Sequence, residues 1–171
     1  MTEHSGHTKS RMADLSQLLW DQRSLIELLE FRLEVQQLLT MAGKVERLHL
    51  AVADVESVID RIRMSEDVRL GVVAECAVEL HLPTGASLRD ISAAAPAPWN
   101  FVLADHQTAL LQLVAATEEL ASANRELAAR GVSEARQAFS HLGTDSQVTA
   151  YGRHGDRPSL ALPPTLVDRT A

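Results

Sequence analysis

The side chains that could do chemistry in this chain include a row of glutamates, and the first question is what they could bind. Glu27, Glu30 and Glu34 are three and four residues apart, so on a helix they form one line of carboxylates. Carboxylate lines of this kind hold pairs of metal ions in helical bundles when Glu-x-x-His motifs face them. We expect no such motif to face this row, and we therefore interpret it as a solvent-facing surface.

The other reactive residue types also lack the spacing that catalysis or metal binding requires. The seven histidines do not cluster at ligand spacing, and a single cysteine, Cys76, cannot form an internal disulfide. The serines lack a Gly-x-Ser-x-Gly turn, and the glycines lack a phosphate-binding loop. The sequence thus predicts a protein that is not an enzyme, with no cofactor and no metal, so its chemistry must be that of binding.

Composition narrows the class of binding protein. The chain has 171 residues, which allows one domain with a tail, and 46% of them are apolar while only 4% are aromatic. A hydrophobic core built from this composition would consist mostly of Leu, Val and Ala, as in helical bundles. The net charge of −7 makes nucleic acid an unfavourable partner. There is no N-terminal signal region and no stretch of about 20 apolar residues, so we expect no membrane insertion and a cytoplasmic location.

The most informative element is a helix predicted over residues 99–142. Its apolar seam has the four-three spacing that keeps one stripe facing a partner helix. The leucines of the seam are Leu103, Leu110, Leu113, Leu120 and Leu127, and the intervening seam positions hold His106, Thr117 and Asn124. After Asn124 the stripe weakens into a surface of small and apolar residues that includes Val132, Ala135, Ala138 and Phe139. A helix whose last third lacks a strong internal partner indicates an external one.

Two further long helices must position this element. The first is expected from about Asp14, which can act as an N-cap, to Met41, where Ala42-Gly43 is a plausible stop. The second is expected over residues 44–81, ended by Pro83 and Gly85. The connector, residues 82–98, is expected to hold a short helix that Ser87 and Asp90 begin as a capping box.

These elements predict an all-α fold. We expect an elongated antiparallel bundle of three long helices, running up-down-up, with a short connector helix and a flexible C-terminal tail. In this division, residues 1–12 are a disordered N-terminus, residues 13–142 form the helical bundle, and residues 143–171 are the tail. Polar residues interrupt the predicted seams and permit either packing within the chain or self-association. They are Gln22, Glu66, Arg69 and Asn124.

In its layout the chain resembles the FlgN-like flagellar export chaperones, the chaperone family of hook-associated proteins. The similarity lies in the order of the segments, which covers roughly residues 14–156. They are LLWDQRSLIELLEFRLEVQQLL at 18–39, LPTGASLRDISAAAPAPW at 82–99, LASANRELAARGVSEARQAF at 120–139 and QVTAYGRHGD at 147–156. The residues before 13 and after Pro158 match no pattern of the family.

The resemblance implies a function. Chaperones of this family hold hook-associated subunits, which form the hook–filament junction, unpolymerised in the cytoplasm and deliver them to the flagellar type III export apparatus. Their C-terminal helical surface would take up an amphipathic helix of the cargo. By this resemblance, the cargo-binding residues are Asn124, Leu127, Val132, Ala135 and Phe139. The Tyr-Gly pair Tyr151 and Gly152 matches a tail motif connected with docking to the export gate.

Several alternatives remain open from the sequence. The chain could instead be a structural coiled-coil adaptor, a self-associating helical scaffold protein without chaperone activity, and its oligomeric state is not determined. Leu127 could belong to the bundle core, and Asn124 could set the register of the helices. Tyr151 could be an ordinary turn residue. A chaperone needs surplus apolar surface mainly near the C-terminus, whereas an adaptor needs it along each helix.

Overall fold

The structure is a computed structural model that describes residues 2–141, with side chains for residues 11–140. These residues form four helices: α1 (Thr2–Met41), α2 (Val45–Glu79), α3 (Leu88–Ala94) and α4 (Trp99–His141). The residues described contain no strand, and no helix among them is long and apolar enough to cross a membrane.

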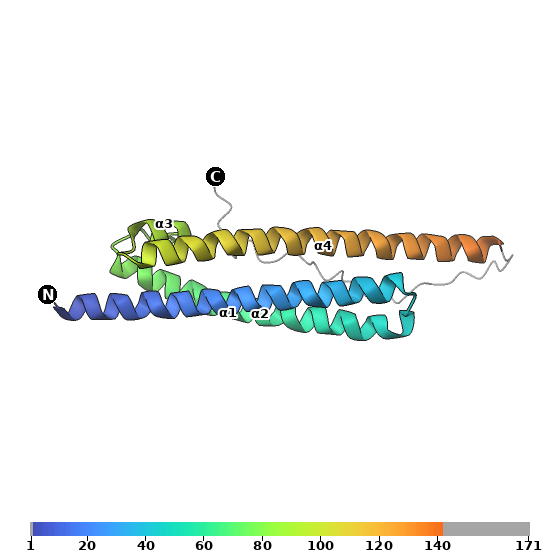
Figure 1. Ribbon diagram of the computed structural model, residues 1–171, viewed down its shortest axis with the longest axis horizontal. Coiled ribbons are helices and arrows are strands. Elements are labelled where there is room, and N and C mark those ends of the chain that lie inside the picture. Colours follow the sequence, from blue (N-terminus) through green and yellow to red (C-terminus); the bar gives the residue numbers. More distant parts are fainter. Residues whose placement is uncertain (1, 142–171) are drawn as a thin grey trace.

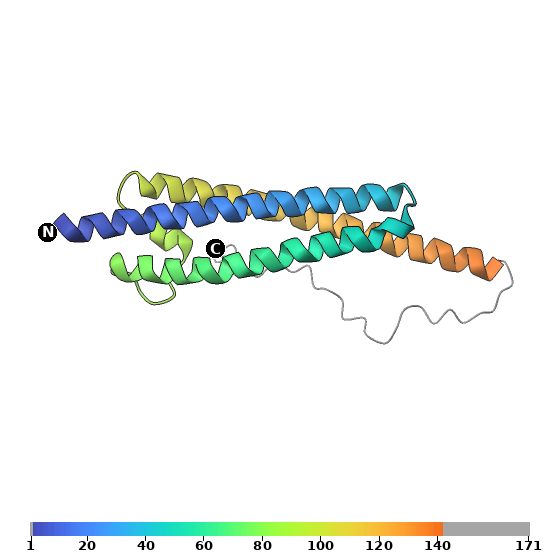
Figure 2. The same ribbon diagram turned by 90° about the horizontal axis from the view of Figure 1, so that it is seen from below.

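The three long helices lie side by side in an elongated bundle (Figures 1 and 2). α2 returns antiparallel to α1, and α4 then runs in the same direction as α1, while the short α3 lies beside the beginning of α4 (Figure 1). This arrangement confirms the predicted all-α, up-down-up bundle with a connector helix. The tail, residues 143–171, lies outside the described residues.

α1 is the central helix of the core, because it packs against both α2 and α4. Its fully buried apolar side chains recur three, four and seven residues apart, as expected for one face of a helix. These residues are Met12, Leu15, Leu19, Ile26, Leu29 and Leu33. From α4, the seam residues Leu103, His106, Leu110, Thr117 and Asn124 are buried, as the sequence predicts.

The predicted start of the first helix at Asp14 is wrong, since α1 begins at Thr2 and takes in most of the stretch expected to be disordered. Contacts with the C-terminal end of α2 account for the extension of α1 from Asp14 back to Arg11. Met12 is fully buried there, and Arg11 forms ion pairs with Glu75 and Glu79 of α2. Tertiary contacts therefore extend the helix past a side chain that could have capped it.

The turn between α1 and α2 follows the prediction. Gly43 has a positive φ of 65°, its N–H donates to the carbonyl of Thr40, and the N–H of Lys44 donates to the carbonyl of Leu39. This is the Schellman arrangement, in which a left-handed residue closes the helix. α1 ends at Met41 as predicted, and the turn limits how far α1 and α2 extend beside α4.

At its other end, α2 stops at Glu79 rather than at His81. His81 has a positive φ of 56°, and the N–H of Leu82 donates to the carbonyl of Ala77. A histidine thus takes the left-handed closing position usually held by glycine, so the helix ends before Pro83 is reached.

The connector helix begins with the predicted capping box. The hydroxyl of Ser87 accepts a hydrogen bond from the N–H of Asp90 at 3.1 Å, and the Asp90 carboxylate accepts from the N–H of Ser87 at 2.9 Å. Hydrogen bonds from the side chain and backbone of Ser87 lower the pKa of Asp90 below its ordinary value. The buried Leu88 and Ile91 then anchor α3, which leads into α4 at Trp99 as predicted.

Candidate functional site

The end of α4 projects beyond the helices that it packs against. Two hydrogen bonds between α1 and α4 give the register of the two helices: Ser16 with His106, and Asn124 with the carbonyl of Leu33, which are 90 and 91 residues apart. If the same separation of 90 or 91 residues holds to the end of α1, its last residue, Met41, lies beside position 131 or 132 of α4. The last ten residues of α4 therefore extend past the α1–α2 turn by about 15 Å, as Figure 2 shows. We call residues 132–141 the α4 overhang.

Burial changes along α4 at the same place. The seam of α4 is buried or half-buried as far as Leu127, with Leu113, Leu120 and Leu127 half-buried, and every residue from 128 to 140 is exposed. Val132, Ala135 and Phe139 are spaced three and four residues apart, so they share one face of the helix. Val132 comes five residues after Leu127, however, so these residues are displaced around α4 from the seam, whose next positions hold Gly131, Glu134 and Ala138. Val132 is 52% exposed and Phe139 is 54% exposed. The overhang therefore carries a short apolar stripe of its own, without a described helix beside it.

Asn124 is placed differently from the other proposed cargo residues. Its side-chain amide donates a hydrogen bond of 2.8 Å to the backbone carbonyl of Leu33, and only 8% of the residue is exposed. A partner could reach this amide only by displacing α1. Asn124 thus ties the overhang to the bundle, in keeping with the register role left open by the sequence, and Leu127 marks the boundary between core and free surface.

Tyr151 and Gly152, the residues matched to the docking motif, lie outside the described residues. The structure therefore brings together only Val132, Ala135 and Phe139 as an exposed apolar surface.

A buried polar cluster inside the bundle was visible in the sequence only as interruptions of the seam. Arg69 donates two hydrogen bonds to the Glu66 carboxylate, from Nε at 2.9 Å and from a terminal nitrogen at 2.6 Å. Gln22 of α1 donates to the same carboxylate at 2.9 Å. The side chains of Arg69 and Glu66 are only 5% and 3% exposed. The cluster sets the register of α2 against α1 and is almost closed to solvent.

A second polar contact lies between α1 and α4. Ser16 and the Nε2 atom of His106 form a hydrogen bond of 3.1 Å, and the ring of Trp20 meets the His106 ring edge-on at 5.1 Å between centroids. The Arg23 guanidinium lies 4.4 Å from the centre of the Trp20 ring. These contacts shield His106, which is 1% exposed, and join the two helices at the end opposite the overhang.

The burial of His106 predicts that the bundle loses stability in acid. Burial chiefly, and the Arg23 charge secondarily, lower the pKa of His106 below its ordinary value of 6.5, while Asp105 opposes this shift. Below pH 6.5 the unfolded chain takes up a proton that the folded chain resists, so this contribution to stability is complete above that pH and is lost as the pH falls toward the lowered pKa. Urea denaturation at about pH 7.5 and about pH 5.5 measures the loss. His106→Gln should show a smaller loss between the two pH values, and an equal loss would contradict the assignment to His106.

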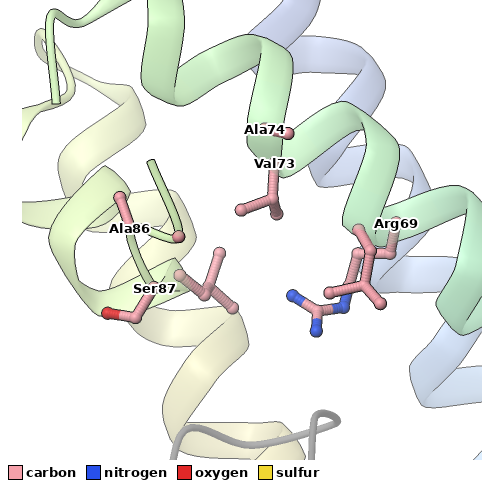
Figure 3. A pocket seen from close by; sticks show the side chains of 8 residues that line it. Arg69, Val73, Ala74, Ala86 and Ser87 are labelled. Atoms are coloured by element: carbon pink, nitrogen blue, oxygen red, sulfur yellow. The ribbon is translucent and has the colours of Figure 1, made fainter. Parts of the chain in front are cut away.

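One pocket opens beside the α2–α3 connection, where α2 residues including Val73 and Ala74 face Ala86 and Ser87 (Figure 3). The Arg69 guanidinium at its edge already binds Glu66, and the Ser87 hydroxyl caps α3. Among the described residues there is no group of three or more His, Cys, Asp and Glu side chains that could hold a metal ion. The pocket thus has a wall of mixed polar and apolar surface, and its polar side chains, Arg69 and Ser87, already have partners within the bundle.

Comparison with known proteins points to one family. A family model described as FlgN protein matches residues 12–159. No curated protein and no solved structure matches the chain. The matched range includes the whole of α2, α3 and α4, and most of α1.

Proposed function

Since that match covers most of the sequence, the chain belongs to the FlgN family of flagellar export chaperones, and we propose that it binds hook-associated subunits through the α4 overhang. The overhang supports this proposal because Val132, Ala135 and Phe139 form an exposed apolar stripe that has no partner within the described residues. An amphipathic helix of the cargo could pair with this stripe as α1 pairs with the earlier part of α4.

The same arrangement accounts for holding the cargo without assembly. A cargo helix that lies along the overhang has its apolar face covered, so it is not free to associate with other subunits, and its free concentration falls by mass action. Because a cargo segment that folds on binding must be ordered at that moment, the affinity stays moderate for the area buried, and release for export remains possible. In this proposal the protein acts in the cytoplasm and passes its cargo to the export gate.

The adaptor alternative receives less support from α4. A self-associating scaffold needs a free apolar stripe along each helix, whereas the inward stripe of α4 is buried or half-buried as far as Leu127, and fully exposed residues follow it. Surplus surface at one end of α4 suits the capture of a terminal segment.

Two truncations test where the cargo binds. A chain that ends at His141 keeps the overhang, and a chain that ends at Gly131 removes it, so we expect hook-associated subunits to be captured by the full chain and by the first truncation but not by the second. Residues 128–140 are exposed, so all three chains should keep the same helical fold and nearly the same melting temperature. Equal capture by all three chains would exclude the overhang, and loss of capture in the chain ending at His141 would place the cargo site in the tail instead.

For the tail, we propose that Tyr151 and Gly152 contact the export gate. A tyrosine provides a large contact area and a polar tip with little loss of entropy on binding. Tyr151→Ala should leave capture of hook-associated subunits unchanged and reduce their export, measured as secreted subunit and as swimming motility. Normal secretion and motility with this variant would remove the docking role.

A further inference from the structure

A second apolar stripe lies on α1, on the side away from the core. Phe31 is 52% exposed and Leu38 is 65% exposed, and the half-buried Leu28 and Val35 lie between and beside them. The four residues are spaced three and four apart, so they lie on one face of the helix. Phe31 is two positions from the buried Leu29, which is about 200° around an α-helix. We call Leu28, Phe31, Val35 and Leu38 the outer α1 stripe.

The outer α1 stripe has the geometry of a helix-docking face. In heptad terms, Leu28 and Val35 take the first core position and Phe31 and Leu38 take the second. The stripe thus presents two successive pairs of core positions over about 15 Å of helix. Leu28 also packs against the bundle core, which anchors the stripe to a rigid element. A central helix that is apolar on its outer side as well as its inner side has more apolar surface than the bundle itself covers.

The charges beside the stripe indicate what kind of helix fits it. Glu27 and Glu34 precede the two first core positions, where coiled coils place the charges that select a partner. Within residues 11–140, neither carboxylate forms an ion pair. On the other flank, Arg32 is already paired with Asp54 of α2 at 3.1 Å and lies 5.7 Å from the centre of the Phe31 ring. The free charge along the stripe is therefore negative.

We propose that the outer α1 stripe is a second docking surface, separate from the overhang, for a cationic amphipathic helix of a partner protein. Apolar residues of that helix would pack between Phe31 and Leu38, and its Lys or Arg side chains would pair with Glu27 and Glu34. A second copy of this chain fits less well: an antiparallel pairing of two stripes brings Glu27 and Glu34 against their counterparts, and each copy carries a net charge of −7.

Two synthetic 21-residue helices serve as probes. Both carry Leu at the two core positions of each heptad, and they differ only at the flanking positions, which hold Lys in one and Glu in the other. Titration of the full chain should give binding of the Lys-flanked helix about tenfold tighter than binding of the Glu-flanked helix, because each favourable or unfavourable charge pair contributes modestly. The double variant Phe31→Ala/Leu38→Ala should bind the Lys-flanked helix about 30-fold more weakly than the parent chain does. Both replaced side chains are more than half exposed, so the fold should persist.

A charge-reversed variant distinguishes binding at the outer α1 stripe from a nonspecific attraction of a cationic helix to an acidic protein. The double variant Glu27→Lys/Glu34→Lys should now prefer the Glu-flanked helix, whereas Val132→Ala/Phe139→Ala should keep the original preference. An unchanged preference in the reversed variant, or unchanged affinity in Phe31→Ala/Leu38→Ala, would overturn the proposal. A dimer of the protein alone that Leu38→Glu dissociates in sedimentation would overturn it too, since the occupant would then be a second copy. Cargo capture by the overhang is measured separately and does not decide this result.

Discussion

Replacing Arg69 by methionine should lower the free energy of unfolding by about 3–5 kcal/mol, the largest effect that we expect from any single substitution in the bundle. The change removes both hydrogen bonds from Arg69 to Glu66 and leaves the carboxylate with the Gln22 amide in a site that is almost closed to solvent. Urea denaturation followed by circular dichroism at neutral pH measures the loss. A loss below about 1 kcal/mol would mean that Glu66 finds water or another partner.

A triple variant provides the control for this experiment. Gln22→Leu/Glu66→Met/Arg69→Met replaces the whole polar cluster by apolar side chains of similar size, so no buried charge is left behind. Such replacements are often neutral or stabilising, and we expect stability within about 1 kcal/mol of the parent chain. If the triple variant is as unstable as Arg69→Met, the cost comes from packing rather than from the uncompensated carboxylate.

The second large effect concerns cargo affinity. Phe139→Asp should weaken the binding of hook-associated subunits by at least about 2 kcal/mol, about 30-fold in Kd, because it places a charge in the centre of the proposed apolar contact. Isothermal titration with a purified subunit measures the change. The free energy of unfolding should change by less than about 0.5 kcal/mol, since Phe139 is 54% exposed and lies beyond the end of α1.

The matched control is Phe101→Asp, which makes the same substitution on the same helix. Phe101 is 72% exposed and lies in the first turn of α4, at the end opposite the overhang. The Phe101→Asp substitution should leave the Kd for the hook-associated subunit within about twofold of the parent value. If Phe101→Asp weakens binding as much as Phe139→Asp does, the cargo does not distinguish the two ends of α4 and the proposed surface is wrong.

The spacing of apolar residues was sufficient to predict the three long helices and the free end of α4. On α4 the four-three seam predicts buried Leu103 and Leu110, and the structure confirms this. Local hydrogen bonding was equally predictable at the cap of α3, where Ser87 and Asp90 need no distant partner. Both depend on interactions within one helix or on a periodicity that any partner helix would satisfy.

Features that depend on the register between helices could not be predicted in the same way. A polar residue in a seam can meet a partner on a neighbouring helix or face a ligand, and the sequence alone does not distinguish them. For Asn124 the sequence leaves both cargo contact and helix register open, and its hydrogen bond to the Leu33 carbonyl favours the register role, while Glu66 finds its partner Gln22 on another helix. The start of α1 was wrong for a related reason: contacts of Arg11 with the end of α2 override the local capping signal at Asp14.

The central claim, that cargo lies along the α4 overhang, is tested most directly by site-specific crosslinking. A photoreactive phenylalanine analogue is placed at position 139 in one full-length protein and at position 101 in another, and each is irradiated with a hook-associated subunit. The proposal predicts a crosslink from position 139 to a terminal helical segment of the subunit and none from position 101. A crosslink of equal yield from position 101, or none from position 139 while the subunit remains bound, would contradict it.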